Sequence, residues 1–221
     1  MCFSAESSFT SAALLAGLSY AAAKQVRRKG QIPLVIVPAV FTLMQLSEGF
    51  TWLGLERGFY PSFWVPFGAY FFLVISHFYW TLIVPFIYVC AETDPTRRKL
   101  LKGIFYGVCA VAVGILALEI TAPRPPESQI VQNSIQYTFS TFEPYPLLDR
   151  FKGPLLALIM IGPGFISTLP GRWILTGVVV ASYLIAMMFY DYAFTSVWCF
   201  FGTAASVAVL WMLHRMNRAE K

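Results

Sequence analysis

The sequence contains few charged residues for its length. Asp, Glu, Lys and Arg make up only 12% of the 221 residues, whereas they make up about a quarter of a typical soluble domain. Because 57% of the chain is hydrophobic, it has too little polar surface to cover a globule in water. Disordered chains and coiled coils are excluded by this apolar content, and a disulfide scaffold by the four scattered cysteines. The composition predicts a protein that crosses the lipid bilayer several times.

Motifs that would assign a function are also missing. The chain has only two histidines, His77 and His214, which are too few for a three-histidine zinc site. It contains no Gly-rich phosphate loop, no Gly-x-Ser-x-Gly elbow and no Cys-x-x-Cys pair. Its basic residues occur in short clusters between apolar runs, and no nucleic-acid-binding motif is visible. We therefore expect the lipid bilayer, and no nucleic acid, as a partner.

Apolar runs long enough to cross about 30 Å of hydrocarbon determine the predicted fold. The first run is short, and the fifth contains Gly162, Pro163 and Gly164, which predict a kink or a partly re-entrant segment. We predict an all-α, polytopic bundle of seven transmembrane helices that forms a single domain over residues 1–221. The predicted spans are about 9–23, 32–55, 63–90, 103–121, 154–170, 172–190 and 193–213.

The distribution of basic residues predicts the orientation of this bundle. With the N-terminus outside and the C-terminus cytoplasmic, 12 of the 16 Lys and Arg residues fall on the cytoplasmic side, as topology rules require. The proline-rich loop 122–153 then lies outside. Within it, residues 130–139 alternate in polarity, which indicates a short strand or an interfacial helix. We expect the protein in a cell membrane.

Polar residues inside the predicted spans are the candidates for function, because such residues normally face the interior of the bundle. Glu48 and His77 are the candidates nearest mid-membrane, and a Glu–His pair across two helices would serve as a proton relay or half of a metal site. The alternative for each residue is a structural role, as a hydrogen-bonded group that fixes helix packing. Glu119 and Asp191 are expected to be solvated near the interface. The predicted pocket-lining residues are Gln45, Trp52, Ser76, Trp80 and Trp198.

Cysteines extend this candidate site. Removal of Met1 would leave Cys2 as an N-terminal residue whose thiolate and amine form a nucleophile or a metal chelate. Its structural reading is a thiol packed or acylated at the membrane surface. The predicted catalytic residues are therefore Glu48, His77 and Cys2. A transition metal such as zinc, copper or iron would be held by Cys2, Glu48, His77 and Cys199.

Three motifs resemble those of an uncharacterised family of bacterial multi-pass integral membrane proteins. They are the opening Met-Cys-Phe-Ser, the Gln45–Trp52 stretch with Glu48-Gly49, and Ser-Val-Trp-Cys-Phe-Phe from Ser196. The sequence departs from the family pattern at Leu46 and Ser47, with one glutamine in place of two. The resemblance implies a bacterial inner-membrane location, but it does not indicate any particular activity. A topology similar to seven-helix zinc hydrolases of the alkaline ceramidase type implies hydrolysis, although their histidines are missing here.

Two functions remain open from the sequence. The first is a membrane protein with an outward-facing polar pocket that binds a metal or a small ligand and hydrolyses its substrate. The second is a non-catalytic accessory or scaffold subunit, which would contact protein partners in the membrane through its aromatic faces and its long outer loop.

Overall fold

The structure, a computed structural model, describes residues 4–57 and 63–219 and is helical over most of them. One antiparallel hairpin of strands β1 (Glu127–Val131) and β2 (Ser134–Thr138) interrupts the helices. The α-helices are α1 (Ala5–Gln25), α2 (Ile32–Arg57), α3 (Trp64–Val74), α4 (Trp80–Ala91), α5 (Pro95–Ile120), α6 (Pro146–Ile166), α7 (Arg172–Phe189), α8 (Phe194–Phe200) and α9 (Gly202–Arg218).

Some of these helices are continuous with the next. The π-helical turn Ile75–Tyr79 joins α3 to α4, and the 3-10 turn Asp191–Ala193, α8 and α9 follow one another in the segment Asp191–Arg218. α1 and α6 have 21 residues each but are not apolar enough to count as membrane-spanning by composition, because α1 is rich in Ser and α6 begins with charged residues. Within the described residues, five helical segments are long and apolar enough to cross a membrane, namely Lys29–Glu56, Trp64–Ala91, Pro95–Ile120, Arg172–Phe189 and Asp191–Arg218.

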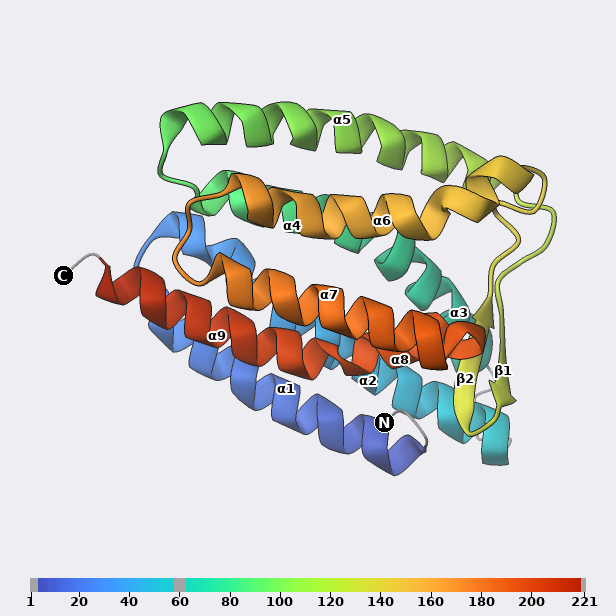
Figure 1. The fold of residues 1–221 in the computed structure, drawn as a ribbon. Coiled ribbons are helices and arrows are strands. Elements are labelled where there is room, and N and C mark those ends of the chain that lie inside the picture. Colours follow the sequence, from blue (N-terminus) through green and yellow to red (C-terminus); the bar gives the residue numbers. More distant parts are fainter. Residues whose placement is uncertain (1–3, 58–62, 220–221) are drawn as a thin grey trace.

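The helices lie side by side along one common direction (Figure 1). α1 packs on α2 and α9, whereas α5 packs mainly on α4 at the edge of the bundle. The outer side of α5 leaves Tyr106, Val113 and Ile120 exposed, as expected of a helix that faces lipid. We call the end of the bundle that holds β1 and β2 the hairpin end, and the other the C-terminal end, since α9 finishes there.

The hairpin confirms the strand alternative for residues 130–139. Gln132 and Asn133 connect its strands with φ angles of 47° and 60°, and two successive positive values form the kind of tight turn that suits a two-residue hairpin. Tyr137 stacks on Phe72 of α3 with ring centroids 4.2 Å apart, and Ile135 is fully buried. The hairpin therefore packs onto the bundle.

Two helix boundaries differ from the predicted spans. α5 begins at Pro95, eight residues before the predicted start at 103, because the Asp94 carboxylate accepts the Arg97 backbone N–H at 2.7 Å and caps the helix. α6 runs from Pro146 to Ile166, and the sequence Gly162-Pro163-Gly164 does not end it. Hydrophobic runs identify the apolar part of a helix but miss a polar first turn.

Glu92 joins two connections at the C-terminal end. Its Oε1 accepts the backbone N–H groups of Thr93 and Asp94, both at 3.0 Å, and the Thr168 hydroxyl at 2.5 Å. Its Oε2 accepts the Ser167 hydroxyl and the Thr168 backbone N–H, both at 2.7 Å. Burial raises the pKa of Glu92, but these hydrogen bonds outweigh burial and lower the pKa to about 2. The carboxylate thereby fixes α4 and α5 relative to α6 and α7.

A second polar contact at this end holds α9 in place. The Asn217 side chain donates to the Gln25 carbonyl at 2.7 Å and accepts the Gln31 amide N–H at 2.9 Å. Gln31 is fully buried, and its Oε1 accepts the Arg27 backbone N–H at 2.8 Å. The last turn of α9 is thus bound to the connection between α1 and α2.

Candidate functional site

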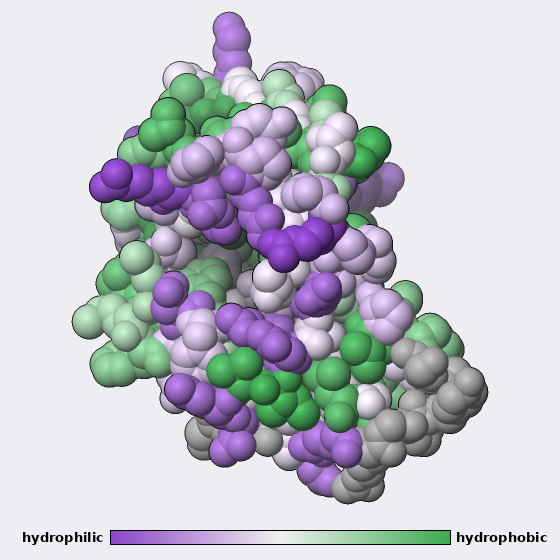
Figure 2. Space-filling view, turned by 90° about the vertical axis from the view of Figure 1, so that its right-hand side faces the viewer, coloured by the Kyte–Doolittle hydropathy of each residue, from purple (hydrophilic) through white to green (hydrophobic). Residues whose placement is uncertain are grey.

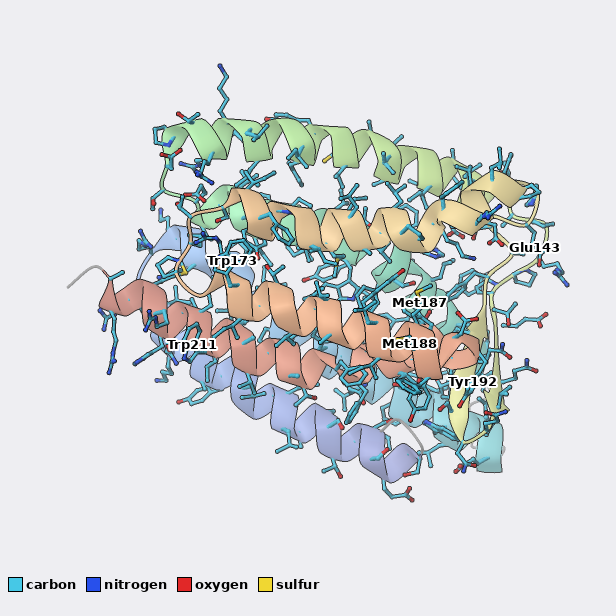
Figure 3. The ribbon with its side chains drawn as sticks, in the orientation of Figure 1. Glu143, Trp173, Met187, Met188, Tyr192 and Trp211 are labelled. Carbon is cyan, nitrogen blue, oxygen red and sulfur yellow. The ribbon has the colours of Figure 1, made fainter. Side chains whose placement is uncertain are left out.

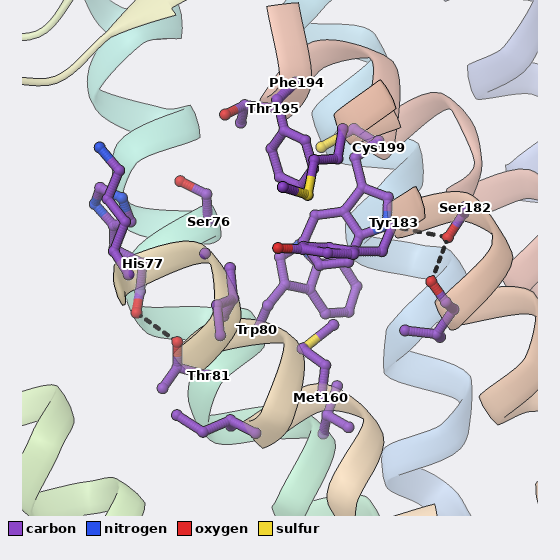
Figure 4. Close-up of a pocket in the computed structure, with 18 of the residues that line it drawn as sticks. Ser76, His77, Trp80, Thr81, Met160, Ser182, Tyr183, Phe194, Thr195 and Cys199 are labelled. Atoms are coloured by element: carbon purple, nitrogen blue, oxygen red, sulfur yellow. Dashed lines mark hydrogen bonds between the residues drawn. The ribbon is translucent and has the colours of Figure 1, made fainter. Parts of the chain in front are cut away.

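A cavity of about 560 Å³ lies inside the bundle, with α4, α6, α7 and α8 forming its main walls (Figure 4). Residues of α2, α5, α9 and the strand β2 complete it. Its middle is apolar and aromatic, as in most small-molecule sites. Residues that define these walls include Phe41, Trp80, Val84, Tyr88, Ile115, Leu156, Met160, Val179, Tyr183, Phe194 and Trp198.

Three aromatic side chains form one wall. The rings of Tyr183, Phe194 and Trp198 lie 5.2 to 5.7 Å apart, at interplanar angles of 42° to 77°. The indole N–H of Trp198 donates to Ser182 Oγ at 3.0 Å, and Ser182 donates to the Val179 carbonyl at 2.9 Å. These bonds fix the indole plane. All three residues line the cavity, and their rings are inclined to one another.

Charged residues of the cavity gather at the hairpin end. Asp149, Arg150 and Lys152 lie at the start of α6, and Asp191 lies where α7 gives way to α8. Figure 3 shows Met187 and Tyr192, two further lining residues, at the same end of the bundle. This end face is hollowed, and hydrophilic side chains lie around the hollow (Figure 2).

These rim charges are only partly paired. Lys152 Nζ lies 2.6 Å from Asp149 Oδ1, whereas within residues 4–57 and 63–219 the Arg150 and Asp191 side chains form no hydrogen bond or ion pair. Both Arg150 and Asp191 are exposed. The rim therefore offers one positive and one negative group to a ligand.

His77 lies on the cavity wall in the π-helical turn. Its Nδ1 is 2.9 Å from Glu119 Oε1 on α5, and the Phe139 and Phe142 rings lie 5.2 and 5.6 Å from its ring. The Glu119 side chain is only 9% exposed. The expectation that Glu119 is solvated was wrong, because the π-helical turn packs against α5 and covers its carboxylate.

Glu48 lies in the core instead of on the cavity wall. Its Oε2 accepts the Gln45 amide N–H at 3.3 Å, and its Oε1 accepts the Ser196 hydroxyl of α8. Glu48 and Ser196 are fully buried. One turn along each helix, Cys199 Sγ lies 4.0 Å from Met44 Sδ. Two motifs that are far apart in the sequence thus meet between α2 and α8.

The structure does not bring the predicted site residues together. The hydrogen-bonding partner of His77 is Glu119 and not Glu48. Cys2 lies outside the described residues. Among those that are described, no group of three or more His, Cys, Asp or Glu side chains could hold a metal ion, so Glu48, His77 and Cys199 form no such site.

The predicted pocket-lining residues separate into two groups. Ser76, Trp80 and Trp198 line the cavity, as do His77 and Cys199. Gln45 and Trp52 are only 1% exposed and, like Glu48, are buried between helices outside the cavity lining that the described residues form. Sequence reasoning did not identify Tyr183, Phe194 or Arg150, because only the packing of distant helices places them around one space.

A comparison with protein families gives a match over the whole chain, residues 1–221. The chain belongs to the family of unknown function DUF6629. No curated protein and no solved structure matches it. The sequence-based assignment to an uncharacterised family is confirmed at this level. In this DUF6629 chain, the Gln45 and Ser196 motifs serve a shared packing contact around Glu48.

Proposed function

We propose that this protein spans a cell membrane and binds one elongated amphiphilic small molecule in the cavity. The observation that supports binding is the separation of the cavity into apolar, aromatic walls and a charged rim at the hairpin end. A ligand with an apolar chain and a polar head matches this separation. Its chain would be stabilised by about 25 cal/mol for each Å² of apolar surface removed from water.

The proposed topology has seven spans. Five spans are the long apolar segments, and α1 and α6, which lie alongside them in the bundle, are the other two. α1 packs on α2 and α9, and α6 packs on α4 and α7, and such packing allows segments of lower hydropathy to cross. The distribution of basic residues supports an orientation with the C-terminal end in the cytoplasm and the hairpin end outside. The charged rim of the cavity would then lie at the level of the outer headgroups.

The length of the cavity fits one acyl chain of a single leaflet. On the helix formed by α3, the π-helical turn and α4, lining residues extend from Ser76 to Tyr88. At about 1.5 Å per residue, this corresponds to about 18 Å, slightly more than half of the ~30 Å hydrocarbon thickness. The cavity volume of about 560 Å³ is also in the range of small-molecule sites.

Two neighbouring alanines of α9 provide a direct test. Ala205 lines the cavity, whereas Ala204 is exposed and lies outside that lining. We expect native mass spectrometry of the protein in a neutral maltoside detergent to detect one retained amphiphile per chain. Ala205→Phe should fill the space and abolish retention, and Ala204→Phe should leave it unchanged.

Two outcomes would contradict the proposal. Equal retention by wild type and Ala205→Phe would place the amphiphile on the outer surface. Purification of the wild type without any amphiphile, but in a stable complex with other membrane proteins, would favour the accessory-subunit alternative.

A further inference from the structure

We infer that the amphiphile has a zwitterionic head with a quaternary ammonium and a phosphate, as in phosphocholine lipids. This inference rests on the proposed function and identifies the ligand class of the same cavity. Two features of the rim lead to it. One is an aromatic wall next to a carboxylate, the other a guanidinium on a different helix, and neither group has a partner among the described residues.

The ammonium position is defined by Asp191 and the aromatic wall. The Phe194 backbone N–H donates to the Asp191 carbonyl, so the carboxylate lies one tight turn from the first ring of the wall. Phe194, Tyr183 and Trp198 are half-buried and mutually inclined, which leaves π surface facing the cavity. Aromatic faces combined with a nearby carboxylate are the usual surroundings of a quaternary ammonium.

The phosphate position is defined by Arg150. Arg150 lines the cavity, and its side chain makes no hydrogen bond or ion pair within the described part of the chain, whereas the neighbouring Lys152 pairs with Asp149 at 2.6 Å. A guanidinium binds phosphate through two parallel hydrogen bonds, which an ammonium cannot form. Arg150 is therefore the better candidate for the phosphate.

Charge balance distinguishes this head from the alternatives. A purely anionic head would pair with Arg150 but would be repelled by Asp191. A purely cationic head would pair with Asp191 but would be repelled by Arg150. A neutral glycerol head would leave both groups without a charged partner. Only a head with both signs satisfies Arg150 and Asp191 at once.

Competition among single-chain lipids with one common acyl chain tests the inference. The purified protein in maltoside is incubated with equal amounts of lysophosphatidylcholine, lysophosphatidylethanolamine, lysophosphatidylglycerol and monoacylglycerol, and the bound species are counted by native mass spectrometry. We expect the choline lipid to exceed monoacylglycerol by at least about tenfold, the size of one good charged or cation–π contact. A further arm adds free phosphocholine, which should compete only weakly because it lacks the chain.

Variants then assign the two positions. Asp191→Asn should remove the preference for the choline lipid. Arg150→Gln should reduce the bound amount of both zwitterionic lipids, the choline and the ethanolamine lipid, toward that of monoacylglycerol. Glu127→Gln and Arg124→Gln, two charge changes at the hairpin end but outside the cavity lining, should leave the ranking unchanged.

The outcomes separate this inference from the proposed function. Equal binding of all four lipids, with loss of all of them in Ala205→Phe, would overturn the zwitterionic head and leave the amphiphile site intact. Preference for the anionic lipid, or an unchanged ranking in both Asp191→Asn and Arg150→Gln, would also overturn it. If none of the four lipids binds, the proposed function itself fails.

Discussion

Replacement of Glu92 by glutamine should destabilise the protein strongly at neutral pH and progressively less as the pH falls below 4.5. The carboxylate accepts five hydrogen bonds from the connections that follow α4 and α6. Glutamine has the same shape, but its amide nitrogen cannot accept the N–H and O–H groups that face one of the oxygens. At least two donors, among them the buried Ser167 hydroxyl or the Thr93 and Asp94 N–H groups, would therefore lose their acceptor.

The expected magnitude comes from the pKa of Glu92. A folded value of about 2, against the ordinary 4.5, corresponds to about 3 kcal/mol at 1.36 kcal/mol per pKa unit. Since the pKa is lowered by folding, this stabilisation is fully present above pH 4.5 and is lost as the pH falls from 4.5 toward about 2. The side chain is only 2% exposed, so solvent screening reduces the effect little.

Unfolding followed by tryptophan fluorescence in detergent, at a series of pH values from 7 to 3, measures this difference. We expect the wild type to be more stable than Glu92→Gln by about 3 kcal/mol at pH 7, with the gap narrowing steadily below pH 4.5. Glu56→Gln, an exposed carboxylate on α2, is the matched control and should show no gap. A gap that is absent at pH 7, or that stays constant down to pH 3, would refute the assigned role of Glu92.

Two further predictions concern buried contacts. Asn217→Ala should lower the free energy of unfolding by about 1 to 3 kcal/mol, because the buried Gln31 amide loses its acceptor. Faster hydrogen exchange at the end of α9 would accompany it, and unchanged exchange there would contradict the contact. Glu48→Ala should cost about 2 to 4 kcal/mol in thermal or detergent unfolding, because it leaves the buried Ser196 hydroxyl without its acceptor. Unchanged stability in Glu48→Ala would show that the carboxylate does not hold α2 against α8.

The helical character of the fold could be predicted because long apolar runs form few structures other than helices. The runs at 32–55 and 63–90 correspond closely to α2 and to the α3–α4 segment Trp64–Ala91. Polar helix starts were missed, as at Pro95, because a side-chain cap adds a charged turn outside the apolar window.

The partners of buried polar residues could not be predicted from local spacing. His77 pairs with Glu119, 42 positions away, and Glu48 contacts Ser196, 148 positions away. A helical stripe shows which face a side chain occupies, but the neighbour of that face depends on the arrangement of the whole bundle. The cavity is a result of the same arrangement, since its aromatic wall combines α7 with α8.

Polar groups in this bundle differ in whether the protein itself supplies their hydrogen-bonding partners, and this difference separates structural groups from candidates for ligand recognition. Glu92 has five protein donors, and Glu48 has hydrogen-bonding partners on α2 and α8. Such groups specify packing, because their hydrogen-bonding needs are met only in the native arrangement. Arg150 and Asp191 line a cavity and have no protein partner in the described part of the chain. A bound molecule with a charge of each sign would gain affinity from contacts with both groups.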